Sequence, residues 1–240
     1  MSNTVLITGG TRGIGRALVT LYLNQGYHVI ATGSSEQSIQ NSRNTLPNAQ
    51  WYACNLTSSK SITTFAQALA DQDINLVIHN AGVQQSRDLF LTHDEAICIE
   101  AETMINFTAP ILLTRLLFDN VNRVKGTWVF STSGLAIAPK QSSPIYCANK
   151  AGLRAFCKSF NGQIALHQSK MKVCEAILPL VDTEMTKGRG KGKITPEKAA
   201  EEIFQGAANG KKEIHIGKVR VLMKVRALFP NFIENIMLKA

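Results

Sequence analysis

The sequence lacks any apolar run that approaches the roughly 20 residues of a transmembrane helix. Its first residues, MSNT, carry no basic side chain and lead directly into a short apolar run, so the features of a secretory signal peptide are also missing. We therefore expect no membrane-spanning helix and no cleaved leader, and we predict a cytoplasmic location.

Cysteine is scarce and occurs in an odd number. None of the five cysteines forms a C-x-x-C motif, and none of the five histidines has a ligand spacing such as H-E-x-x-H. These absences argue against a disulfide framework and a zinc site. We expect free thiols in a reducing compartment and no bound metal. The residues concerned are Cys54, Cys98, Cys147, Cys157, Cys174, His28, His79, His93, His167 and His215.

Acidic residues are outnumbered, with 17 Asp and Glu against 26 Lys and Arg and a formal net charge of +9. Residues 187–240 hold 12 basic and 5 acidic residues, so +7 of this charge lies in the last 54 positions. Such a surface suits nucleic acid, an anionic membrane or a phosphorylated ligand. No nucleic-acid recognition motif accompanies the charge, so we expect a solvated surface and no nucleic-acid partner.

Hydrophobic residues make up 45% of the chain, and apolar runs of strand length alternate with segments of helical periodicity. This alternation is typical of βαβ units in a parallel sheet. We predict one doubly wound Rossmann-type α/β domain over residues 1–240, with a seven-stranded, mostly parallel sheet and helices on both faces. Strands are predicted at 4–8, 27–32, 50–54, 75–80, 126–132, 172–178 and 213–216. Helices are predicted at 14–25, 35–45, 59–71, 101–120, 144–168 and from 196 onward.

A glycine-rich turn, TGGTRGIG, connects the first predicted strand to the first helix. Gly9 permits the tight turn, Gly13 lets the backbone approach a pyrophosphate, and Gly15 allows the helix to pack closely on the strand. The free N–H groups of the helix N-terminus attract negative charge. The turn therefore predicts a dinucleotide site.

This turn and five later features together resemble the short-chain dehydrogenase/reductase family, from about residue 4 to residue 183. Asn80-Ala81-Gly82 resembles the NNAG motif, with His79 in place of the first Asn, and residues 146–150 match YxxxK. Ser133 stands 13 residues before Tyr146, and Asn106 matches the catalytic asparagine. Residues 178–183, LPLVDT, resemble PGxVxT. The resemblance implies hydride transfer to or from a nicotinamide cofactor.

The predicted catalytic residues are Asn106, Ser133, Tyr146 and Lys150. Tyr146 and Lys150 share one face of the 144–168 helix, and a nearby ammonium is expected to lower the tyrosine pKa toward neutrality. Tyr146 would then act as general acid or base. The resemblance implies that Lys150 also binds the nicotinamide ribose, that Ser133 polarises the carbonyl and that Asn106 holds a relay water. Ser131 is a weaker alternative to Ser133.

NADP(H) is expected in preference to NAD(H). No acid follows the 27–32 strand until Glu36, and Arg12 offers positive charge to a 2′-phosphate, with Ser34 as a further donor. A second arginine common in the family is missing. The resemblance further implies that adenine lies near Asn55. The expected cofactor-binding residues are Gly9, Thr11, Arg12, Gly13, Ile14, Gly15, Ser34, Asn55, Leu56, Asn80, Ala81, Gly82, Tyr146, Lys150, Pro179, Val181 and Thr183.

Two further segments carry expectations about substrate and assembly. Residues 184–210 correspond to the family's substrate lid and include the basic loop KGRGKGK at 187–193. Residues 218–240 form an amphipathic segment interrupted by Pro230, for which burial in the core or a dimer is the simpler expectation and a peripheral membrane contact the alternative. The 144–168 helix resembles the family's dimer-forming helix, so we expect a homodimer or homotetramer.

We therefore predict an oxidoreductase that transfers a hydride between NADP(H) and a small carbonyl or secondary alcohol. The alternative is a non-catalytic NADP(H)-binding sensor or interaction protein on the same fold. The presence of all four predicted catalytic residues favours the enzyme.

Overall fold

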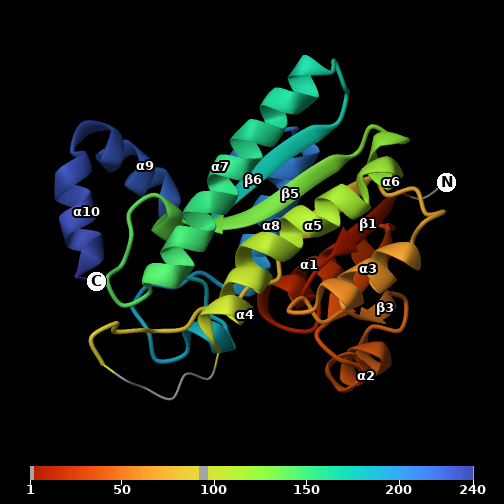
Figure 1. Cartoon of the computed structure of the whole chain (residues 1–240), viewed down its shortest axis with the longest axis horizontal. Helices are drawn as coiled ribbons and strands as arrows, with labels where there is room; N and C mark the ends of the chain where they lie inside the picture. Colours follow the sequence, from red (N-terminus) through yellow and green to blue (C-terminus); the bar gives the residue numbers. More distant parts are fainter. Residues whose placement is uncertain (1–2, 92–96, 240) are drawn as a thin grey trace.

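The computed structural model describes residues 3–91 and 97–239. Within them, seven strands form one sheet in the order β3-β2-β1-β4-β5-β6-β7, and every pairing is parallel (Figure 1). The predicted Rossmann-type α/β fold is thus confirmed. The strands are β1 (Thr4–Ile7), β2 (His28–Gly33), β3 (Gln50–Ala53), β4 (Leu76–His79), β5 (Thr127–Ser133), β6 (Lys172–Leu178) and β7 (Glu213–His215).

Helices cover both faces of the sheet because the strands are apolar on both sides. Alternate residues of β1 illustrate this: Leu6 packs in one buried cluster, and Val5 and Ile7 pack in the other. One cluster includes side chains of α3 (Ser59–Gln67), α5 (Ala109–Leu116) and α7 (Pro144–Leu166). The other includes side chains of α1 (Gly13–Asn24), α2 (Glu36–Thr45) and α8 (Pro196–Ala208).

The strand order reverses between β1 and β4, and this reversal positions the site. The chain runs outward from β1 to β3 and then returns to β4 on the other side of β1. In parallel sheets, ligands bind outside the carboxyl ends of the strands at such a switch point. The segments after β1, β4 and β5 therefore meet at one edge of the sheet.

The helix expected over 101–120 is interrupted. The chain forms α4 (Ile99–Thr103), a π-helix (Met104–Thr108), α5 and then α6 (Phe118–Asn122). In a regular α-helix the N–H of residue 110 would bond to the Asn106 carbonyl, but Pro110 has no N–H. The Ala109 N–H instead bonds to the Met104 carbonyl, five residues back. Proline at this position therefore favours the wider turn, which periodicity alone did not reveal.

The C-terminal segment folds as two helices, α9 (Val219–Leu228) and α10 (Pro230–Leu238), which we call the C-terminal hairpin (Figure 1). α9 packs on Ile137 and Ile177 through Val219, Leu222 and Met223. α10, all of whose residues the structure describes, has no buried residue. Of the two expected modes of burial, the core is therefore wrong for α10, and burial in a dimer stays a prediction. Across the described residues, no helix combines the length and apolarity needed to span a bilayer.

Candidate active site

The glycine-rich turn requires glycine for steric reasons at three positions. Gly9 and Gly13 have φ angles of 68° and 52°, in the left-handed region. A Cβ on Gly15 would lie 2.0 Å from the Gly9 carbonyl oxygen. Arg12 is the N-cap of α1, and among the described residues no side-chain hydrogen bond caps this helix end. The first N–H groups of α1 thus remain available to an anion.

The segment after β4 is fixed against this turn. The Asn80 side chain donates hydrogen bonds to the carbonyls of Thr8 and Gly9, at 3.1 and 3.4 Å. The Thr8 hydroxyl accepts from the backbone N–H groups of Asn80 and Ala81, both at 3.1 Å. A Cβ on Gly9 would lie 3.0 Å from the Ala81 Cα, so only small residues fit here. These contacts hold the two loops together at the carboxyl edge of the sheet.

The four predicted catalytic residues converge beside these loops. Ser133, at the end of β5, is hydrogen-bonded to the Tyr146 side chain. Lys150 lies one turn further along α7, with its Nζ 5.7 Å from the centroid of the Tyr146 ring. A Cβ on Gly82 would lie 3.0 Å from Asn106 Oδ1 and 3.5 Å from Lys150 Nζ, so both side chains approach the space that the missing side chain of Gly82 leaves open.

The two candidate serines have different surroundings. Ser133 contacts Tyr146, whereas Ser131 contributes its backbone carbonyl, which accepts a hydrogen bond from Lys150 Nζ at 2.9 Å. The buried Ser131 hydroxyl finds no hydrogen-bond partner among the described residues. This geometry favours Ser133 as the serine that meets a substrate.

Burial sets the proton affinities of the tyrosine–lysine pair. Desolvation raises the pKa of Tyr146 to about 12, although the hydrogen bond with Ser133 opposes this shift. Desolvation also lowers the pKa of Lys150 to about 8. The expected fall in the tyrosine pKa is therefore wrong for the folded chain alone. The ammonium bonds to the Ser131 carbonyl, and its attraction for the phenolate does not offset the cost of burying that charge.

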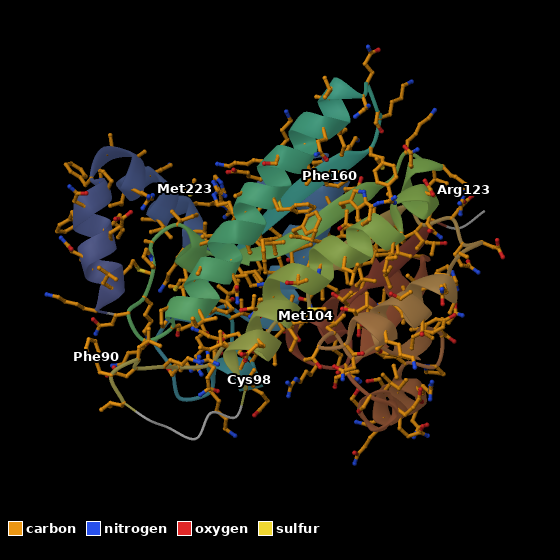
Figure 2. All side chains as sticks on the ribbon, in the orientation of Figure 1. Phe90, Cys98, Met104, Arg123, Phe160 and Met223 are labelled. Carbon is orange, nitrogen blue, oxygen red and sulfur yellow. The ribbon has the colours of Figure 1, made fainter. Side chains whose placement is uncertain are left out.

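Asn106 lies in the π-helix and is fully buried. Its Nδ2 donates to the Val83 carbonyl at 2.7 Å, and its Oδ1 accepts from the Val83 N–H at 3.1 Å. Both polar atoms of this side chain therefore hold the segment that follows Gly82 in place. Figure 2 labels Met104, which begins the π-helix.

A buried ion pair beside the site was missed from the sequence. Arg87 and Glu102 pair with side-chain exposures of 2% and 0%, and Glu102 also accepts a hydrogen bond from the Gln85 N–H at 3.2 Å. The Glu102 charge contributes to the raised pKa of Tyr146. Glu102 precedes Asn106 by four residues in a predicted helix, and this spacing was the available sign that it shares the buried face.

His79, which replaces an asparagine in the family's motif, is buried in the core. Its ring stacks between Trp128 and Phe130, and its Nε2 lies 3.1 Å from the Thr114 hydroxyl oxygen. Desolvation lowers its pKa to about 3, so the ring is neutral at physiological pH. His93, also considered as a metal ligand, lies outside the described residues.

The remaining predicted cofactor residues lie at the same edge of the sheet, in two groups, one at each end of the predicted dinucleotide site. At one end, Arg12 and Ser34 are exposed, and a Cβ on Gly33 would lie 2.8 Å from Thr11. Asn55 is exposed, and its Oδ1 accepts hydrogen bonds from the Thr57 N–H and hydroxyl at 3.0 and 2.8 Å. The neighbouring predicted residues Ile14 and Leu56 are half-buried and buried, respectively.

At the other end, the segment after β6 approaches the glycine-rich turn. A Cβ on Gly13 would lie 3.1 Å from the Thr183 methyl group. Val181 is buried and forms a β-bridge with Ile194, and Pro179 lies between β6 and this bridge. The structure thus brings the two ends of the predicted dinucleotide site to one edge of the sheet.

Comparison with known proteins places this architecture in a family. The family model described as short chain dehydrogenase matches residues 3–193. The uncharacterized oxidoreductase DltE of Bacillus subtilis is 33% identical over 222 residues, which cover 89% of this chain and 87% of that protein. The 3-oxoacyl-[acyl-carrier-protein] reductase FabG of Vibrio cholerae is 28% identical over 187 residues, which cover 76% and 75%.

Solved structures share the fold at low sequence identity. A short chain dehydrogenase from Burkholderia cenocepacia in complex with NADP has a TM-score of 0.88 and 20% identity, with 100% of this chain and 98% of that chain covered. A short chain dehydrogenase/reductase from Burkholderia phymatum in complex with NAD has a TM-score of 0.83 and 15% identity, with 96% and 95% covered. The fold, the ordered motifs and the family match together identify the chain as an oxidoreductase of the short-chain dehydrogenase family.

Proposed function

We propose that the protein transfers a hydride between NADP(H) and a small carbonyl or secondary alcohol, with Tyr146 as the proton donor or acceptor. The observation that carries this proposal is the convergence of Ser133, Tyr146, Lys150 and Asn106 at the switch point of the sheet. A non-catalytic binding protein has no chemical need for a tyrosine hydrogen-bonded to this serine.

A dinucleotide fits the residues present. The uncapped N-terminus of α1 offers N–H groups to a pyrophosphate, and the missing side chains of Gly13 and Gly15 allow close approach. Lys150 would hold the ribose, and Val181 and Thr183 would border the nicotinamide. When bound, the reduced nicotinamide supplies the hydride that a carbonyl carbon accepts.

The chain's own residues would handle the carbonyl oxygen. Ser133 and Tyr146 are hydrogen-bonded to each other, so a carbonyl oxygen placed between their hydroxyls would be polarised by both. A tyrosine with a pKa of about 12 keeps its proton at neutral pH and can donate it as negative charge develops on that oxygen. Pro110 has no N–H to donate to the Asn106 backbone carbonyl. We assign this carbonyl to the binding of the relay water.

The preference for NADP(H) is supported by charge. Arg12 is exposed at the glycine-rich turn, and residues 32–35 contain no acid. The nearest acid, Glu36, pairs with Arg43 at 2.8 Å, so its charge is compensated. A 2′-phosphate at this end would meet Arg12 without a facing carboxylate.

Tyr146→Phe tests the catalytic proposal. The substitution keeps the ring and removes the proton, so kcat should fall about 10²–10⁴-fold with nearly unchanged cofactor affinity. The measurement is NADPH consumption across a panel of carbonyl compounds, with binding followed by cofactor fluorescence. Tyr27→Phe, outside the site, is the matched control and should keep parental kcat.

Parental kcat in Tyr146→Phe would refute the assignment of Tyr146. Tight NADPH binding without turnover of any carbonyl would instead favour the sensor alternative.

A further inference from the structure

The C-terminal hairpin carries an apolar stripe that the core does not use. Leu228, Phe229 and Phe232 are 73%, 61% and 62% exposed, and Ile236 is also exposed. Leu228 ends α9, Phe229 lies between the two helices, and Phe232 and Ile236 are one turn apart on α10. The packing contacts of α9 use other side chains, Val219, Leu222 and Met223. The stripe is therefore available to a partner outside the chain.

A second apolar segment lies beside the hairpin. Leu89, Phe90 and Leu91 are exposed, with Phe90 97% accessible. The Arg87 N–H bonds to the Ser142 carbonyl at 3.0 Å, and the next residue back, Gln141, donates its N–H to the Leu238 carbonyl at 3.2 Å. These two hydrogen bonds tie the start of this loop to the end of α10. Figure 2 shows Phe90 on the same side of the molecule as the hairpin.

The surroundings of this surface are basic. Residues 218–239 contain five basic side chains and one acid, Glu234. Arg226 pairs with Glu234 and Arg220 pairs with Glu202 of α8, so the remaining positive charges of the segment are those of Lys218, Lys224 and Lys239. A Cβ on Gly192 would lie 2.5 Å from Lys218 Nζ, so the KGRGKGK loop touches the start of the hairpin. Exposed aromatic and aliphatic side chains are therefore combined with a local excess of positive charge.

We propose that the C-terminal hairpin docks the protein on the surface of a lipid bilayer that contains anionic lipids. Interfacial helices bury an apolar face at the headgroup boundary while Lys and Arg attract anionic headgroups. A second copy of this chain would present the same positive charges to the hairpin and repel it. The charge therefore favours an anionic lipid surface over self-association as the occupant of this surface.

Vesicle sedimentation of the full chain tests this proposal. We expect binding to phosphatidylcholine vesicles that contain phosphatidylglycerol, and much weaker binding to phosphatidylcholine alone or at high salt. Lys218→Gln with Lys224→Gln should weaken binding by roughly fivefold per charge. Phe229→Ser with Phe232→Ser should weaken it by at least about tenfold. Because these side chains are exposed, unchanged melting temperatures are expected.

Leu166→Ser is the matched control, since Leu166 is 77% exposed at the distant end of α7. It should bind vesicles as the parent does. Failure of the parent to bind anionic vesicles would overturn the proposal, as would equal loss in the control. The proposal would also be overturned if the parent bound no vesicles and formed a dimer that dissociates in the Phe229→Ser/Phe232→Ser variant, because the hairpin would then join two copies.

Discussion

At the scale of single residues, burial is the dominant influence on the chemistry of the site. Tyr146 and Lys150 are neighbours on α7, yet desolvation raises the pKa of the phenol and lowers the pKa of the ammonium. Both shifts disfavour charge. The folded chain alone therefore holds a protonated tyrosine, which suits donation to a carbonyl. Positive charge from an oxidised nicotinamide would be needed to favour the phenolate for alcohol oxidation.

Arg12→Ala should weaken NADP(H) binding and leave NAD(H) binding nearly unchanged, because only NADP(H) carries the 2′-phosphate. Loss of one charge-assisted contact predicts about a 10- to 100-fold effect on the dissociation constant. Calorimetric titration of both cofactors measures it. Arg16→Ala is the control, since Arg16 bonds to the Thr45 hydroxyl at 3.0 Å. Equal affinity of the parent for both cofactors would contradict the preference.

The residues of the site differ in how well sequence predicts them. Tyr146 and Lys150 were placed together because a four-residue spacing on a helix fixes a shared face. The direction of the tyrosine pKa shift could not be predicted, because it depends on how much surrounding protein excludes water. Glu102 was missed because acidic residues are usually exposed. Its burial depends on an ion pair with an arginine 15 residues away, and the sequence pattern does not predict that pair.

At the scale of secondary-structure elements, hydrophobic periodicity predicted the strands of the sheet. It did not predict the interruption of a helix that a single residue causes. The strands were predictable because a sheet covered on both faces demands continuous apolar runs. The expected 101–120 helix is interrupted by the π-helix at Met104–Thr108, because Pro110 lacks the N–H that would close a regular turn on the Asn106 carbonyl. The exposure of the hairpin could not be predicted either, because an apolar stripe in the sequence does not identify the surface that packs against it.

Asn106→Ala tests how firmly the π-helix anchors the segment after β4. It leaves the N–H and carbonyl of the half-buried Val83 without these partners, which should cost about 1–3 kcal/mol in the free energy of unfolding. For a chain of this size, the melting temperature should fall by about 2–4 °C for each kcal/mol. Thermal unfolding followed by circular dichroism measures the shift.

Asn161→Ala is the control for that measurement, because the hydrogen bond from the Asn161 side chain to the Val173 carbonyl is long, at 3.4 Å. A melting temperature in Asn106→Ala no lower than in this control would show that Val83 is held by other contacts.

At the scale of the whole molecule, α7 is the surface we propose for self-association. Ala148, Ala151, Ala155 and Ser159 are exposed at spacings of three and four residues, so a strip of small side chains runs along the helix. Such a strip allows two helices to approach closely. We predict a homodimer or homotetramer by light scattering, which Ala155→Arg should dissociate. Val221→Arg, on α9, should leave it assembled; a monomer at every concentration would contradict the prediction.

The contact between α9 and the residue after Ser133, the proposed catalytic serine, has a kinetic consequence. A Cβ on Gly134 would lie 3.1 Å from Leu222, so the proposed membrane-docking hairpin rests directly beside Ser133. An enzyme docked in this way would meet apolar substrates by diffusion in two dimensions. Its rate would follow the mole fraction of substrate within the lipid surface rather than the bulk concentration, and dilution of the substrate with inert lipid would slow turnover at constant total substrate.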